Sequence, residues 1–185
     1  NGAKSFCKPF LWFIEQLYND LFNDFKWSPD LRGLFEEICV ILNVKYTMPR
    51  RYVSHRWLSV YDVTLDTLRL FDALTVFYFP WVSKLNSERV MFLPAIVEIY
   101  QRHRVSESSK ERITEIRKEL LKKNLTRDGH DRKDRIVDRI FYQRKLSKMI
   151  MGLYSSVLPL LKSFVFLFEM KEPLIHQLHE EQVKL

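Results

Sequence analysis

The residues best suited to chemistry lie where a basic loop is predicted to enter a helix. Residues 52–62 read YVSHRWLSVYD, with Arg56 and Trp57 adjacent at the expected helix start, and Arg50 and Arg51 precede them in the loop. A guanidinium can hold a phosphate through its rigid fork of donors, and an indole ring can stack on an unpaired base. The structural alternative is that Trp57 anchors a core, since buried aromatic residues dominate cores.

A second candidate region is basic. The formal net charge is +7, and residues 102–148 contain 16 Lys and Arg but 8 Asp and Glu. From this region we select Lys122, Lys123, Arg132 and Lys133 as candidate DNA contacts. A concentrated basic face can meet nucleic acid or an acidic partner. Charge counts alone favour a solvated helix with i,i+4 ion pairs.

No catalytic or metal-binding pattern stands out. His176 and His179 would share a helix face, but two ligands fall short of a tetrahedral site. Cys7 and Cys39 lie on separate predicted helices without CxxC spacing, so neither a zinc site nor a disulfide framework is expected. The many carboxylates, such as Asp62, Asp66, Asp72, Asp134 and Asp138, are expected to be solvated or paired with nearby arginines. We therefore predict no catalytic residue, metal or cofactor in this chain.

Composition and periodicity predict an all-α, multi-helix bundle of about six to seven helices. Only four glycines and seven prolines occur, which leaves little turn chemistry for a strand-rich protein. We expect a single all-helical domain or fragment over 1–185. Its expected parts are a helical hairpin in 1–43, a basic loop in 44–56, helices in 57–104, a basic polar connection with one helix in 105–131, and a long kinked helix with a truncated last helix in 132–185.

Helix boundaries follow from capping residues and prolines. The first helix should end near Lys26, and Ser28-Pro29 should cap and open the second. A third helix should run from Arg56 or Ser59 to about Phe79, and a fourth should be capped by Ser87 and bent at Pro94. A fifth should run from Ser109 to Lys123, followed by a connection in 124–131. We expect a long helix over 132–168, kinked near Pro159, and a last helix that opens at Pro173.

Residues 149–168 are apolar enough to be considered for a membrane span. Lys162 lies within them, and a central lysine costs roughly 2.5–3.5 kcal/mol on insertion scales. A buried core helix is the better interpretation, so no membrane partner is expected. The N-terminal residues lack the features of a signal peptide and an initiator Met, and we expect a longer parent chain.

Residues 56–62, RWLSVYD, followed by Asp72-Ala73-Leu74, resemble the TRW-(N/L)-S-x-x-D segment of hAT-superfamily transposases and their domesticated descendants. Two other parts resemble the family in the same order: the leading aromatic helix with Ser28-Pro29, and the segment from LPLL at 158–161 to EPLIH at 172–176. The resemblance thus extends from about Phe10 to Leu178.

This resemblance implies the all-helical insertion of an RNase H-like transposase core. It also implies that Trp57 stabilises a flipped base, with Arg56 beside it. The family's metal-binding Asp, Asp and Glu match no residue here, so we expect no strand cleavage by this chain, and a divalent metal such as Mg²⁺ only in a parent that keeps those acids. We therefore expect this chain to be a non-catalytic region of a nuclear protein, and we expect it to contribute to DNA binding. The alternative is a domesticated interaction scaffold that meets acidic proteins or self-associates.

Overall fold

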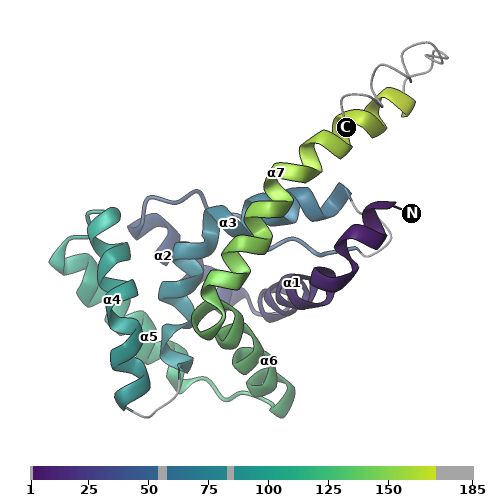
Figure 1. Cartoon of the computed structure of the whole chain (residues 1–185). Coiled ribbons are helices and arrows are strands. Elements are labelled where there is room, and N and C mark those ends of the chain that lie inside the picture. Colours follow the sequence, from purple (N-terminus) through teal and green to yellow (C-terminus); the bar gives the residue numbers. More distant parts are fainter. Residues whose placement is uncertain (1, 54–57, 83–85, 170–185) are drawn as a thin grey trace.

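The computed structural model describes residues 2–53, 58–82 and 86–169 (Figure 1). Over these ranges the chain forms α-helices joined by turns and loops, with no strand, which confirms the predicted all-α multi-helix class. The helices are α1 (Gly2–Lys26), α2 (Pro29–Ile41), α3 (Leu58–Tyr78), α4 (Asn86–Arg102), α5 (Glu107–Lys122), α6 (Arg127–Val137) and α7 (Arg144–Glu169). The predicted helix at Pro173 lies outside the described residues.

Local capping chemistry explains several boundaries. Ser28 is the N-cap of α2, where its side chain accepts the backbone N–H of Leu31, and Pro29 follows at the first helical position, as predicted. The predicted cap Ser87 was wrong, because α4 begins at Asn86 and Ser87 already lies within the helix. The predicted start of α5 was wrong, because Ser106 rather than Ser109 caps the helix.

Two further boundaries differ from the sequence prediction. Residues 124–131 were expected to be a connection, but Thr126 accepts the Gly129 N–H and starts α6 at Arg127. The single helix expected over 132–168 is interrupted by a π-helical turn at Asp138–Tyr142. There the Gln143 N–H bonds to the Asp138 carbonyl at 2.8 Å. This bond reaches one position farther back than an α-helical bond, so an extra residue separates α6 from α7.

Helix α3 is the central element. It packs along α7 and α2 and also contacts α4 and α6, while α1 packs mainly on α6. Helices α1 and α2 meet near their connection, where the Phe25 and Phe35 rings lie 5.0 Å apart. In Figure 1, α4 and α5 lie on the side of the molecule away from the N-terminus and from the far end of α7. Within the described ranges, no helix is long and apolar enough to cross a membrane.

Candidate nucleic-acid interface

The loop between α2 and α3 is held by aromatic side chains that point inward. Tyr46 packs edge-on against Phe35 of α2, and the buried Tyr52 donates its hydroxyl to Glu15 of α1. Because these two rings face the core, the intervening Arg50 and Arg51 are left exposed.

Arg50 lies against the first turns of α3. Its Nε is 2.6 Å from Asp66 Oδ2, and its Nη1 is 3.8 Å from Asp62 Oδ2. Lys162 of α7 approaches the other oxygen of Asp62 at 3.9 Å. Arg69 pairs with Asp66 at 2.7 Å. Two carboxylates therefore bring together cations from the loop, from α3 and from α7.

We call this set the α3 entrance surface and define it by Arg50, Arg51, Asp62, Asp66, Arg69 and Lys162. Three of its cations pair with its two carboxylates, and Arg51 next to Arg50 is exposed, so a positive surplus remains within this set. Arg50 and Lys162 are both half exposed. Their shared partner Asp62 is also half exposed, and exposed ion pairs are weak and exchange readily with other partners. Asp66 is mostly buried, but it keeps its ion pair with Arg69 when Arg50 donates to a phosphate.

Arg56 and Trp57, the strongest sequence candidates, lie outside the described residues. They precede Leu58, the first residue of α3, directly in the chain. Their predicted roles as phosphate and base contacts remain predictions.

The other four candidates lie elsewhere. Lys122 is exposed, and Lys123 pairs with Asp30 of α2 at 2.9 Å. Arg132 lies 3.9 Å from Asp24 of α1. The side chain of Lys133 is only 1% exposed and makes an ion pair with Asp24. Lys133 was therefore misplaced by the sequence analysis: its ammonium is in the core and does not face a ligand.

Lys133 lies in an aromatic enclosure at the end of α3. Its Nζ is 4.3 Å from the ring centroid of Trp81 and 5.0 Å from that of Tyr78, whose hydroxyl donates to Asp24 at 2.6 Å. Burial lowers the pKa of Lys133, and the neighbouring Asp24 carboxylate opposes that shift. Burial is the main cause that raises the pKa of Tyr78 well above its ordinary value, and the negative charge of Asp24 raises it further.

Two of the candidate residues, Arg50 and Lys133, thus lie at opposite ends of α3. Asp62, which contacts Arg50, lies in the first turns of this helix, and Tyr78, which contacts Lys133, is its last residue. At a rise of about 1.5 Å per residue, the two positions are roughly 24 Å apart along the helix axis. A single phosphate cannot contact both groups.

Most of the basic region at 102–148 is tied into the fold. Arg135 pairs bidentately with Asp20 of α1 at 2.7 and 2.8 Å, and Arg112 pairs bidentately with Glu37 of α2 at 2.6 and 2.9 Å. Pairs within a single helix also occur, such as Lys110 with Glu107. Several cations of this region therefore join helices that are far apart in sequence, whereas others, such as Lys118, Lys122 and Arg127, are exposed.

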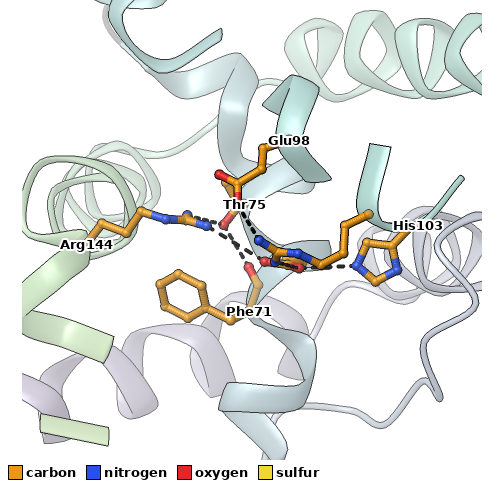
Figure 2. Close-up of polar contacts among 7 residues, drawn as sticks. Phe71, Thr75, Glu98, His103 and Arg144 are labelled. Carbon is orange, nitrogen blue, oxygen red and sulfur yellow. Dashed lines mark hydrogen bonds and ion pairs between the residues drawn. The ribbon is translucent and has the colours of Figure 1, made fainter. Parts of the chain in front are cut away.

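Another such junction joins α3, α4 and α7 at Asp72. Figure 2 shows His103 and Arg144 approaching it beside Phe71 and Thr75 of α3. Asp72 Oδ2 accepts hydrogen bonds from Arg102 at 2.7 Å and from His103 at 3.2 Å. Arg144 lies 3.7 Å from its other oxygen and donates to Thr75 Oγ1 at 2.8 Å. Burial raises the pKa of Asp72, but the His103 hydrogen bond and the Arg102 charge outweigh it, so the pKa is lowered.

In the described part of the chain, no cluster of three or more His, Cys, Asp or Glu is placed to hold a metal ion. Lys162 and Arg69 of the α3 entrance surface were not predicted from the sequence. Asp62 lies in the segment at 56–62 that resembles the transposase motif. Nothing in the local sequence indicates that Lys162, 100 residues later, pairs with this carboxylate. Comparisons with protein families, with curated proteins and with solved structures found no match to this chain.

Proposed function

We propose that this chain is a non-catalytic helical region of a transposase-derived nuclear protein and that its α3 entrance surface binds the DNA backbone. The observation that carries the proposal is the gathering of cations around Asp62 and Asp66 at the start of α3. The resemblance of residues 56–62 to the RW segment of hAT transposases supplies DNA as the ligand. Arg56 and Trp57 would then extend this surface toward an unstacked base.

The physical basis is neutralisation of phosphates. Each phosphate that a cation neutralises releases counterions from DNA, so the logarithm of affinity falls linearly with the logarithm of salt concentration, by about 0.9 for each contact. Arg50, Arg51 and Lys162 are the cations most accessible for this purpose. Affinity should therefore be strong at low salt and should fall steeply as salt is added.

The test is a salt series of fluorescence-anisotropy titrations with a labelled DNA hairpin. The double variant Arg50→Gln with Lys162→Gln should weaken binding and should reduce the salt slope by about 2, one for each contact removed. The matched control is Lys118→Gln with Arg127→Gln, which removes the same charge from two exposed residues on α5 and α6 that were not candidate DNA contacts. The control should retain most of the salt slope.

Asp62→Asn provides a test of opposite sign. It removes the carboxylate that pairs with both Arg50 and Lys162, so DNA should bind more tightly. Equal losses in the two double variants would mean that net charge alone governs binding. No affinity for DNA at low salt would remove the proposal.

A second candidate function, an interaction scaffold for other proteins, is favoured by a separate observation. The outer face of α4 exposes a row of apolar side chains, including Val90, Leu93 and Val97. This function does not depend on DNA binding.

A further inference from the structure

Helix α4 is apolar on two faces. Its inner face buries Ile96 and Ile99, whereas Val90, Leu93 and Val97 follow one another at i, i+3 and i+7 on the outside. Val90 is 61% exposed and Val97 is 49% exposed. Only residues 90–97 of α4, VMFLPAIV, are apolar all round. Such a segment is normally buried all round, so its outer face has the character of a surface that a partner covers.

The helix that carries this face is firmly held. Near its start, Phe92 packs against Phe141 and Tyr142, with centroids 5.3 and 5.1 Å apart. At its end, Arg102 and the following His103 bond to Asp72 in the junction of Figure 2. The outer face is thus presented by a helix fixed at both ends, which lowers the entropic cost of binding a partner.

The apolar row leads into a surface hollow of about 350 Å³. Apolar atoms of Val97, Tyr100 and Val105 contribute to its lining, and its charged residues are Arg104 and Lys110. Lys110 pairs with the exposed Glu107 at 2.6 Å. Such an exposed pair has a small net strength. Arg104 is exposed and makes no ion pair with any residue that the structure describes.

A further cation lies behind Tyr100. The guanidinium of Arg117 is 6.0 Å from the Tyr100 ring centroid and 4.8 Å from that of Phe79. Its Nε and Nη2 atoms are buried and have no acceptor among the described residues. The hollow therefore has an apolar lining, basic edges and a positive charge beneath it, which complements a carboxylate.

The backbone at Arg104 is in an unusual conformation. Its φ is 50°, which lies in the left-handed region. The next N–H, of Val105, bonds to the Tyr100 carbonyl at 2.9 Å. Glycine is the residue that best suits this position at a helix terminus. An arginine here places a free cation at the end of the apolar row.

We propose that the outer face of α4 binds an acidic amphipathic helix of a partner protein. The apolar residues of that helix lie along Val90, Leu93 and Val97, and one of its carboxylates pairs with Arg104 at the hollow. This is the helix-in-groove mode of recognition, with charge complementarity setting the choice of partner. The surface is separate from the α3 entrance surface.

The probe is a synthetic helical peptide of Leu and Glu, with Leu at i, i+3, i+4 and i+7, and its counterpart has Lys in place of every Glu. Binding is followed by NMR of the methionine methyl groups in the full chain. Met91 on α4 is 59% exposed and Met149 on α7 is 62% exposed, so Met149 serves as an internal control. The Glu peptide should shift the Met91 signal and leave the Met149 signal in place.

Two variants separate the contacts. Leu93→Ser removes an exposed apolar anchor and should weaken binding of the Glu peptide about tenfold. Arg104→Gly removes the cation where glycine suits the backbone and should weaken binding about fivefold. Asn43→Gly is the matched control, because Asn43 has nearly the same φ, 51°, and lies at the end of α2. It should bind like the unmodified chain.

Three results would overturn the proposal: equal binding of the Lys peptide, equal shifts of Met91 and Met149, or unchanged affinity in both variants. A Met91 signal that moves with protein concentration alone would identify a second copy as the occupant and would also overturn it. Each of these results is independent of any DNA titration, so this proposal and the DNA-binding proposal can fail separately.

Discussion

The two ends of α3 use the same residue types for different purposes. At its start, Arg50 and Lys162 share Asp62 in contact with solvent. At its end, Lys133 and Asp24 form an ion pair that is almost fully enclosed, with side chains 1% and 4% exposed. Arg50 and Lys162 can exchange the Asp62 carboxylate for a phosphate, whereas Lys133 cannot leave Asp24.

Burial accounts for this difference. Removing one partner of a buried ion pair leaves an uncompensated charge in a medium of low polarity, whereas an exposed charge is solvated when its partner is lost. The same Lys–Asp or Arg–Asp chemistry is therefore structural at one end of α3 and available to a ligand at the other. Four predictions test this contrast.

The largest effect is expected from Asp24→Ala. It leaves the Lys133 ammonium buried without a carboxylate and removes the acceptor of the Tyr78 hydroxyl. The free energy of unfolding should therefore fall by about 3–5 kcal/mol. The measurement is urea unfolding followed by circular dichroism. Asp62→Ala at the other end should cost less than about 1 kcal/mol. Equal losses in the two variants would abolish the distinction between the two ends.

The next effect concerns the charge itself. Combining Asp24→Asn with Lys133→Met removes both charges, keeps an acceptor for Tyr78 and fills the space with an apolar chain. Because a neutral replacement of a buried ion pair is often tolerated, the double variant should regain about 2 kcal/mol relative to Asp24→Asn alone. If Lys133→Met instead lowers the free energy of unfolding further, the ammonium stabilises this end of α3 through contacts other than its ion pair with Asp24.

A third prediction concerns alkaline pH. Burial raises the pKa of Tyr18, opposed by its hydrogen bond with Thr64, and the pKa of Tyr78 is also raised above the ordinary 10.0. A folded-state pKa above that of the unfolded chain means that the stability is fully present below about pH 10 and is lost as pH rises further. The lowered pKa of Lys133 acts in the opposite direction: it makes the free energy of unfolding rise with pH until the pH reaches the ordinary pKa of lysine, 10.5.

We expect the two tyrosines to outweigh the lysine above about pH 10, so the unfolding midpoint should fall there. Tyr18→Phe should flatten this decline, at a cost of about 1 kcal/mol near neutral pH from the lost hydrogen bond to Thr64. Urea unfolding at a series of pH values checks both statements. A decline that is as steep in Tyr18→Phe as in the unmodified chain would contradict this role of Tyr18.

The smallest effect on stability is expected from Arg50→Gln. Its ion pairs with Asp62 and Asp66 are exposed on the arginine side. The free energy of unfolding should therefore change by no more than about 0.5 kcal/mol. Urea unfolding of this variant beside its DNA titration separates stability from binding. A loss comparable to that of Asp24→Ala would make the α3 entrance surface structural.

The parts of the fold that were predictable from sequence depend on local chemistry. The start of α2 follows from Ser28 and Pro29, whose effects act within one helical turn. The π-helical turn at Asp138–Tyr142 was not predictable, because the apolar residues Ile136 and Ile140 continue a helical spacing through it. An inserted residue is a property of the packing on either side, which a periodic pattern does not report.

The candidate residues show the same limit. Lys133 looked exposed because it follows Arg132 in a charged segment, yet it precedes the buried Ile136, Val137 and Ile140 at i+3, i+4 and i+7. That spacing was the signal that it belongs to the core face of α6. No comparable signal pointed to Lys162, since its partner Asp62 lies in a distant helix.

Two ion pairs that join α1 to α6 also affect how the chain folds during its synthesis, because their partners are far apart in sequence. Asp24 is made 109 residues before Lys133, and Asp20 is made 115 residues before Arg135. At about 5–20 residues per second, the ribosome needs roughly 5–20 s to cover such an interval. During that time α1 and α2 have neither the cations of α6 nor the aromatic rings that enclose Lys133 in their final arrangement. The nascent chain is then most exposed to chaperones and proteases, and its final compaction must wait until α6 has emerged.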